Sequence, residues 1–404
     1  MSIAGYDHKT WIEISKNALE NNIRVVRGLL APGAKLMAVV KANAYGHGLK
    51  EIASVLKKET DIMFGVDSFE EALVVKSIAP KNEIMILGYI PEKNLTFAIK
   101  KGFHISIYDK DVLRHVARLV KTGRINPKTI KAHLKIETGT NRLGIRPSEL
   151  KNVVFEFPIA GIYTHFADSE NLNSPFYKEQ IERLNEAIEI LKNKGISPRF
   201  VHSACTAAAM RGVSSGLNPT KAGSAEHFVK QNVLGNLVRV GIGLYGLWPS
   251  GKLKEKLSQK IKLKPVLSWK TKIVQVRCVS RGETVGYDRT YKVKKETSIA
   301  VLPIGYYDGY DRKLSQRGSP PHSGSECGGE VIINGKRAKI AGRVCMNMTM
   351  VDLGGIKARA GDEVVLIGCQ GKERIIADEL AEKIGTINYE VVSRINPLLP
   401  RVCI

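Results

Sequence analysis

The chain of 404 residues carries 62 Lys and Arg against 39 Asp and Glu, a net charge of +23, and 43% of its residues are hydrophobic. This length predicts two or three domains with a sizeable core. The basic residues are spread along the expected helices, without an arginine-rich arm or interleaved aromatic residues, which argues against nucleic-acid binding. A basic surface of this kind attracts anionic small molecules instead.

Targeting and cysteine patterns indicate the cellular compartment. The amino terminus, MSIAGYDHKTWIEI, has no apolar stretch of signal-peptide length, and no run of about 18 apolar residues follows that could span a membrane. The six cysteines are dispersed and form no C-x-x-C pair, which predicts reduced thiols. We therefore expect a cytoplasmic protein with no metal site and no membrane partner.

Apolar, β-branched runs alternate with helical segments over the first part of the chain. Helical periodicity marks residues 49–58, 68–77 and 174–195, the last closed by a glycine. Strand and helix repeated eight times over about 250 residues predict an α/β fold, a (β/α)8 TIM barrel over residues 1–249. The eight expected strands are residues 36–41, 61–67, 83–88, 103–109, 130–137, 159–166, 199–204 and 237–246.

The pattern changes after about residue 249 to short strands separated by Gly, Asn and Asp, with one short helix near 376–384. Residues 250–404 are therefore predicted to form a second, mostly β domain, on which the amino-terminal segment of the chain could pack. The segment 319–330 is rich in Gly, Ser and Pro and is expected to be a mobile loop.

Reactive side chains lie at the carboxyl ends of several expected strands, where barrel enzymes carry their chemistry. Lys41 is the last residue of the first expected strand. A lysine at a strand end is often only solvated, and a lone histidine in a strand is more often a hydrogen-bonded core residue than a catalyst. Taken together, however, these side chains predict a basic cavity. The other members are Lys135, Arg142, His165, His202 and Arg239.

Two loops after the seventh and eighth expected strands have the composition of a phosphate site, and barrels commonly hold a phosphate at this place. One loop carries Thr206, and the other carries the stretch Gly241-Ile242-Gly243, so that a hydroxyl and unhindered amides are available. A phosphate-bearing cofactor beside a lysine suggests pyridoxal 5'-phosphate held as a Schiff base.

Motifs along nearly the whole chain resemble those of the alanine racemases, a family of fold III pyridoxal-phosphate enzymes. The matching stretches are TWIEISKNALENNIRVVR, AVVKANAYGHG, HLKIETGTNRLGI, YTHFADS, RVGIGLYG, GETVGYDRTY, LPIGYYDG, GRVCMNM and TINYEVVSRI. The resemblance implies an isomerase that interconverts L-alanine and D-alanine with pyridoxal 5'-phosphate and supplies D-alanine for peptidoglycan. It also implies a homodimer in which each active site is shared between subunits.

The resemblance implies two catalytic residues. Lys41 would hold the cofactor and act as one acid–base group, and Tyr287 would act as the other on the opposite face of the substrate. Racemisation needs two such groups, because a proton removed from one face must be returned from the other. Arg239 would face the pyridine nitrogen and leave it unprotonated, since an arginine keeps its own proton near neutrality. This choice would limit side reactions such as transamination.

The same resemblance implies further binding residues. Arg142 would contact the cofactor phenolate and the substrate carboxylate, which Met346 would also meet through its backbone N–H. Lys135 is carbamylated in many relatives, but the sequence shows only that the lysine is available. Tyr306 and Tyr389 would narrow the entrance, so alanine is the expected substrate. The cofactor would also be contacted by His165 near its ring and, at its phosphate, by Tyr45, Thr206, Gly241, Ile242 and Tyr389.

Two positions depart from the family pattern. Cys205 stands where an asparagine is usual, and the side-chain amide is lost there. Asn347 stands where an aspartate is usual, and a neutral amide offsets no neighbouring positive charge. Neither departure removes a named acid, base or anchor.

Alternative functions remain open at this point. A serine racemase or a racemase of broader specificity is compatible with the same fold, since a small pocket rejects an added hydroxyl poorly. A fold III amino-acid decarboxylase is disfavoured because the chain lacks the run of three glycines that those enzymes use for the phosphate. A non-catalytic pyridoxal-phosphate carrier is disfavoured by the β domain with Tyr287.

Overall fold

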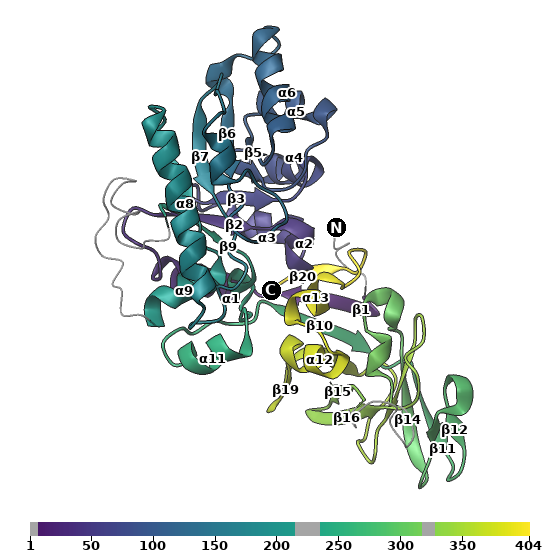
Figure 1. The fold of residues 1–404 in the computed structure, drawn as a ribbon. Helices are drawn as coiled ribbons and strands as arrows, with labels where there is room; N and C mark the ends of the chain where they lie inside the picture. The colour runs from purple at the N-terminus through teal and green to yellow at the C-terminus, as the bar shows by residue number, and fades with distance from the viewer. Residues whose placement is uncertain (1–6, 215–234, 317–327) are drawn as a thin grey trace. The chain divides into compact units, whose positions relative to one another are not determined.

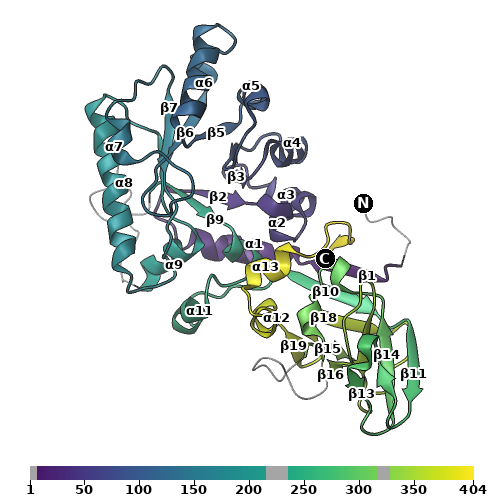
Figure 2. The same cartoon turned by 45° about the vertical axis from the view of Figure 1, so that its right-hand side comes forward.

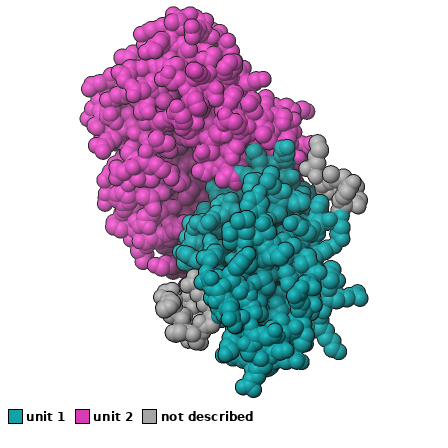
Figure 3. Space-filling view, turned by 90° about the vertical axis from the view of Figure 1, so that its right-hand side faces the viewer, with its two compact units in different colours: residues 1–17, 43–51, 265–404 teal, residues 18–42, 52–264 magenta. Residues whose placement is uncertain are grey.

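The chain folds into two compact units, and each unit is made of segments that are separated in the sequence (Figure 3). The computed structural model describes residues 7–214, 235–316 and 328–404. The barrel unit comprises residues 18–42 and 52–264, and the β unit comprises residues 1–17, 43–51 and 265–404.

The eight strands of the barrel unit are parallel and follow the order β8-β7-β6-β5-β4-β3-β2-β9. Most of their residues are buried, as expected for parallel strands covered on both faces. The two edge strands are joined by hydrogen bonds from Asn236 N to Val201 O at 2.9 Å and from Arg239 N to Ala204 O at 3.0 Å. The strands are β2 (Lys35–Val39), β3 (Met63–Val66), β4 (Ile84–Ile86), β5 (His104–Ile107), β6 (Lys131–Lys135), β7 (Ile159–Tyr163), β8 (Phe200–His202) and β9 (Leu237–Val240).

Helices connect these strands and lie on the outside of the sheet (Figures 1 and 2). The longest described helix, α8, is capped by Ser174, whose hydroxyl accepts a hydrogen bond from Tyr177 N, and it buries Leu184, Ala187 and Leu191. The helices between residues 16 and 264 are α1 (Lys16–Arg27), α2 (Lys41–Tyr45), α3 (Leu49–Leu56), α4 (Phe69–Ile78), α5 (Glu92–Lys100), α6 (Lys110–Lys121), α7 (Pro147–Leu150), α8 (Pro175–Asn193), α9 (Thr206–Ser214) and α11 (Gly251–Leu257), with 3-10 turns η1 (Pro127–Thr129) and η2 (Ile242–Tyr245).

A ten-stranded, mostly antiparallel sheet forms the β unit in the order β11-β14-β17-β16-β15-β18-β10-β1-β20, with β19 paired to β18. The strand β1 (Thr10–Ile14) pairs antiparallel with β10 and parallel with β20, so the first and last strands of the chain lie side by side. The remaining strands are β10 (Leu267–Lys272), β11 (Gln275–Val279), β14 (Thr297–Leu302), β15 (Glu330–Ile333), β16 (Lys336–Ile340), β17 (Thr349–Asp352), β18 (Glu363–Gln370), β19 (Glu373–Ile375) and β20 (Arg401–Cys403), and β12 (Thr284–Val285) pairs with β13 (Tyr291–Lys292) outside this sheet.

Short helical elements complete the β unit. The helix α12 (Ala377–Ile384) occupies the place where one short helix is predicted. A second helix, α13 (Asn388–Ser393), was not predicted. The 3-10 turns are η3 (Tyr287–Arg289), η4 (Tyr306–Asp308) and η5 (Arg312–Leu314).

The predicted fold class, a (β/α)8 barrel followed by a mostly β domain, is confirmed. The predicted end of the first strand was wrong. The strand β2 ends at Val39, and Lys41 is the first residue of α2 rather than the last residue of the strand. The reason is the backbone after Lys41, which has positive φ values and leaves the sheet at once. Most of the predicted loop 319–330 lies outside the described residues, which omit 317–327.

The structure also bears on the expected absence of membrane-spanning helices and on the expected state of the cysteines. Within the described ranges no helix is long and apolar enough to cross a membrane. The cysteines in those ranges are free thiols: Cys205, Cys278, Cys345, Cys369 and Cys403.

Candidate active site

The backbone after Lys41 follows a left-handed helical turn. Ala42, Asn43, Ala44 and Tyr45 have φ values of 53°, 53°, 53° and 52°. A non-glycine residue in this conformation costs about 1–2 kcal/mol, so four in succession persist only where surrounding contacts hold them. Strain of this kind clusters at functional sites, and here it directly follows the lysine that the sequence singles out.

Contacts within the β unit hold the chain just after this turn. Arg401 donates from Nε and Nη2 to Gly46 O at 3.1 Å and 2.9 Å. A Cβ atom on Gly46 would lie 1.8 Å from Val392 O, so only glycine fits at this close approach. Asn43 Oδ1 accepts a hydrogen bond from Leu49 N at 2.8 Å, which closes the turn onto α3. The strained segment is therefore pinned by backbone and side-chain contacts.

Lys41 has an acidic neighbour in the barrel unit. Its Nζ lies 3.6 Å from Oδ1 of Asp67, the residue that follows β3. Both side chains are partly exposed, so this ion pair contributes little stability. The amine stays available for chemistry.

A cluster of positive charges surrounds Lys135 at the carboxyl end of β6. The side chain is 7% exposed. Burial, together with the charges of Arg142, Arg239 and Lys41, lowers the pKa of Lys135 to about 8. The predicted basic residues Arg142, Arg239 and Lys41 therefore act together on Lys135, and their charges raise the neutral fraction of its amine.

His165 lies in the same cluster. Burial and the charges of Arg239, Arg142, Lys135 and Lys41 lower its pKa to about 3. The imidazole is therefore neutral under physiological conditions. It can accept or donate a hydrogen bond without adding a further positive charge to the cluster.

The loop after β6 carries Arg142 and is ordered by Glu137. The Glu137 carboxylate accepts hydrogen bonds from Gly139 N at 2.5 Å and Arg142 N at 3.2 Å. Burial raises the pKa of Glu137, but its backbone N–H donors lower it, and the net direction is downward. The carboxylate therefore stays ionised and fixes the backbone that presents the guanidinium.

Arg239 in β9 is 5% exposed and holds a buried charge without a carboxylate partner among the described residues. Its Nη1 donates to Nδ1 and the carbonyl oxygen of His202, and its Nη2 donates to Thr164 O at 2.6 Å and Ser203 O at 3.1 Å. Four of the five N–H groups are therefore used. Within the described part of the chain, Nε–H has no hydrogen-bond partner and is the donor left for a ligand.

A small anion cradle is built at the start of α9. Gly241 N and Gly243 N donate hydrogen bonds to Thr206 Oγ1, at 3.3 Å and 3.5 Å. A Cβ atom on Gly243 would lie 2.7 Å from Thr206 Cγ2, so glycine is required there. Ile242 begins the following 3-10 turn. The threonine hydroxyl, held by the two glycine amides at the N-terminus of a helix, suits a phosphate group.

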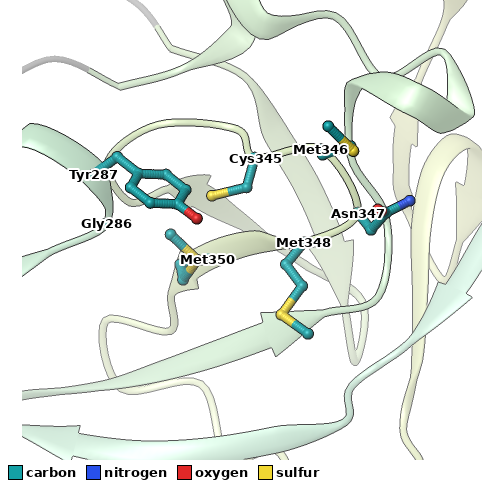
Figure 4. Close-up of a pocket in the computed structure, with 7 residues that line it drawn as sticks. All are labelled: Gly286, Tyr287, Cys345, Met346, Asn347, Met348 and Met350. Carbon is teal, nitrogen blue, oxygen red and sulfur yellow. The ribbon is translucent and has the colours of Figure 1, made fainter.

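The β unit contributes a separate group of the predicted residues. Tyr287 is 68% exposed on turn η3 and lines an open pocket of about 580 Å³ together with Met346, Asn347 and Cys345 (Figure 4). An adjoining pocket of about 380 Å³ is lined by Tyr287, Met346 and Tyr306. The structure therefore brings together the predicted second base and two predicted substrate-binding residues.

The turn that presents Tyr287 is held by an ion pair. Asp288, at φ 55°, lies with its Oδ2 2.5 Å from Arg343 Nη1. Arg343 also lines the smaller pocket. This contact fixes the backbone next to the tyrosine while leaving its phenol exposed.

The two predicted phosphate-binding tyrosines are neighbours in the β unit. The ring centroids of Tyr45 and Tyr389 lie 6.1 Å apart, at an interplanar angle of 51°. Tyr389 is carried by α13, the helix that the sequence did not predict.

Several residues of the site were missed from the sequence. Asp67 beside Lys41, Arg343 beside Tyr287 and the buried histidines His104 and His133 were not singled out. The available signal was a histidine within each of two otherwise apolar strands. That signal alone is also typical of a satisfied core residue.

The barrel with its cluster of cationic side chains, and the β unit with its exposed tyrosine, define a two-unit barrel enzyme. Comparison with known proteins identifies the family. The family model for the alanine racemase N-terminal domain matches residues 14–249, and that for the alanine racemase C-terminal domain matches residues 266–403. The chain belongs to the alanine racemase family, and the resemblance predicted from its motifs is confirmed.

Individual relatives are similar over their full length. The chain is 36% identical to alanine racemase from Leptospira interrogans, covering 98% of this chain and 96% of that protein. It is 37% identical to alanine racemase from Carboxydothermus hydrogenoformans, covering 97% and 98%. Among solved structures, it matches alanine racemase from Bacillus anthracis with bound L-Ala-P at a TM-score of 0.83 and 31% identity, covering 99% and 96%. It also matches alanine racemase from Streptomyces lavendulae at a TM-score of 0.85 and 28% identity, covering 99% and 98%.

Proposed function

We propose that this chain is an alanine racemase that interconverts L-alanine and D-alanine with pyridoxal 5'-phosphate. The observation that carries the proposal is the cluster of cationic side chains in the barrel unit, in which the charges of Lys41, Lys135, Arg142 and Arg239 act on one neutral histidine, His165. Such a cluster suits an anionic cofactor, and the lysine suits its covalent attachment. The full-length similarity to alanine racemases supports the same conclusion.

The residues present fit this cofactor. The cradle of Thr206, Gly241 and Ile242 suits its phosphate, and a Cβ at the neighbouring Gly243 would meet the threonine. The unpartnered Nε–H of Arg239 suits a ring nitrogen that lacks a proton. His165 and the tyrosine pair Tyr45 and Tyr389 would complete the binding set.

The chain's own residues would perform the proton transfers. When bound, the cofactor supplies an electron sink that acidifies the Cα–H bond of the substrate. Lys41 would anchor the cofactor and, once its Nζ is released, would take or return the Cα proton on one face. The Tyr287 hydroxyl would do the same on the opposite face, as racemisation requires. Arg142 and the backbone N–H of Met346 would bind the substrate carboxylate and so fix the Cα between the two bases.

Arg239 would direct the reaction toward racemisation. A guanidinium donates a hydrogen bond and gives up no proton near neutrality, so it leaves the ring nitrogen unprotonated. By leaving that nitrogen unprotonated, Arg239 would favour racemisation over transamination.

We infer a homodimer with two shared sites. The predicted bases lie in different units, Lys41 in the barrel unit and Tyr287 in the β unit. Tyr287 is exposed on its own unit, and its pocket is open. Such an arrangement suits a site in which the barrel unit of one subunit meets Tyr287 of the partner subunit. The product, D-alanine, would serve peptidoglycan synthesis in the cytoplasm.

The proposal is tested by assaying the purified chain with pyridoxal 5'-phosphate on L-alanine and L-serine, with D-isomer formation and carbon dioxide release followed in parallel. We expect D-alanine from L-alanine, slower conversion of serine because Tyr306 and Tyr389 narrow the entrance, and no carbon dioxide. Faster conversion of serine would favour a serine racemase. Release of carbon dioxide would favour a decarboxylase, and cofactor binding without turnover would favour a carrier.

A further inference from the structure

A row of buried histidines connects Arg239 to a carboxylate within the barrel. Nη1 of Arg239 lies 2.8 Å from Nδ1 of His202, and Nε2 of His202 lies 2.8 Å from Nδ1 of His133. Nε2 of His133 lies 2.8 Å from Nδ1 of His104, and Nε2 of His104 lies 3.4 Å from Oε1 of Glu83. The three histidines are 0–2% exposed. We call this row the histidine relay.

The arginine end of the relay fixes the direction of each hydrogen bond from Arg239 to His104. An arginine has donors and no acceptor, so Nδ1 of His202 must accept, and its proton must sit on Nε2. That proton is donated to Nδ1 of His133, which places the proton of His133 on Nε2 in turn. The same step places the proton of His104 on Nε2, which faces Glu83. Glu83 Oε1 lies 3.4 Å from this nitrogen, too far out of hydrogen-bond geometry to count as a made bond, and it places an anion opposite the N–H that this pattern requires.

The charge states agree with this direction. Burial lowers the pKa of His202 and of His133 well below the usual value, and the charge of Arg239 adds to the effect. Burial also lowers the pKa of His104, against the opposing influence of Glu83. The neighbouring His104, whose Nε2 lies 3.4 Å from Glu83 Oε1, holds the pKa of Glu83 at about 2. Three neutral imidazoles therefore separate a buried cation from an anion.

Other charged groups face the anionic end. Lys35 Nζ lies 3.4 Å from Glu83 Oε2. Lys131 and Arg199 also act on Glu83 or His104 through their charges. These cations favour the ionised form of Glu83 and the neutral form of His104, which is the state that the relay requires.

We propose that Glu83 is a positioning residue for Arg239 and acts on it through the three histidines. This contact chain would fix the orientation of the guanidinium plane, so that Nε–H points to the cofactor nitrogen. The relay occupies Nη1, and the carbonyl oxygens of Thr164 and Ser203 occupy Nη2. If Glu83 were neutral, or if the hydrogen bonds of the relay ran in the opposite direction, the orientation of the Arg239 guanidinium would be less well fixed. The role of Arg239 at the cofactor rests on the proposed function. The tautomers of the three histidines do not depend on that function.

The first test reads the tautomers directly. The holoenzyme is labelled with 15N-histidine, which gives nine imidazoles, and single substitutions assign the three relay residues. We expect His104, His133 and His202 to be neutral with the proton on Nε2. A proton on Nδ1 of His133 or His202, or a cationic form of either, would overturn the relay whether or not the chain is a racemase.

The second test reads the effect on the reaction. Glu83→Gln should raise the ratio of transamination to racemisation of alanine by about two- to tenfold, a range typical of coupled residues in one hydrogen-bond network. His104→Phe should have the same effect, and His104→Gln should restore much of the wild-type ratio, since an amide both accepts and donates. A structural defect alone would lower both reactions together and leave their ratio unchanged.

A matched control is available on the outside of the barrel. Glu92 Oε2 lies 3.5 Å from His115 Nδ1 and has no link to Arg239. Glu92→Gln should leave both the relay tautomers and the reaction ratio unchanged. If Glu83→Gln behaves like Glu92→Gln in both measurements, Glu83 is not a positioning residue. Absence of D-alanine formation by the wild-type chain would instead refute the proposed function, and the tautomer measurement would still decide the relay.

Discussion

Carbon dioxide should add reversibly to Lys135. The neutral amine attacks the carbon atom, an N–C bond forms, and one N–H proton leaves to solvent, so that the amine becomes an anionic carbamate. Only the neutral amine reacts. With a pKa of about 8 instead of 10.5, the neutral fraction at pH 7 is about 10% instead of about 0.03%, an increase of about 300-fold.

The surroundings of Lys135 favour the product as well. Burial is the largest cause of the lowered pKa of the amine, and the charges of Arg142, Arg239 and Lys41 add to it because they repel the protonated form. The same positive charges attract the anionic carbamate. Formation of the carbamate therefore replaces a repulsive interaction of these cations with Lys135 by an attractive one. At a fixed concentration of dissolved carbon dioxide, formation of the carbamate should increase between about pH 7 and pH 9 and decline as the pH falls below about 7.

The assay is 13C NMR of the enzyme in 13C-bicarbonate, which should show one bound carbamate carbon. Lys135→Ala should lose this signal. Lys131→Ala, at the opposite end of β6, should retain it and serves as the matched control. Absence of the signal from the wild-type enzyme up to pH 9, or its persistence in Lys135→Ala, would refute the reasoning.

Three further substitutions test separate parts of the account. Lys41→Ala should purify without a cofactor that borohydride can fix to the chain and without racemase activity, and a fixed cofactor would count against the assignment. Arg239→Glu should allow the ring nitrogen to be protonated and raise transamination relative to racemisation, whereas an unchanged ratio with cofactor bound would argue against this role. Gly46→Ala should lower the midpoint of thermal unfolding more than Gly385→Ala, because a Cβ at position 46 would lie 1.8 Å from Val392 O while position 385, also at positive φ, has no atom within 4 Å. Equal shifts would show that backbone conformation alone sets the cost.

The barrel could be predicted because its signal is local and repeated. Each strand is a short apolar run and each helix carries its own periodicity, so errors at single boundaries leave the pattern intact. The barrel residues Lys135, Arg142, His165 and Arg239 could be singled out for the same reason, since strand ends in a barrel share one face. Their roles still depended on motifs of a known family.

The remaining features could not be predicted because they depend on contacts between distant parts of the chain. The pairing of β1 with β10 and β20 joins residues more than 250 positions apart. The positive φ values of Ala42–Tyr45 contradict the local preference of these residues and persist through contacts such as those at Gly46. The histidine relay joins four strands and a carboxylate, and each histidine alone is indistinguishable from a core residue.

The central claim is that Lys41 and Tyr287 of the partner subunit act as the two bases of one alanine racemase site. Lys41→Ala and Tyr287→Phe should each be nearly inactive as homodimers. Unfolding and remixing equal amounts should make about half of the dimers mixed, each with one site that has both bases, so about a quarter of the wild-type conversion of L-alanine to D-alanine should return. If mixed dimers form and activity stays at the level of the separate variants, the claim of a shared two-base site is contradicted.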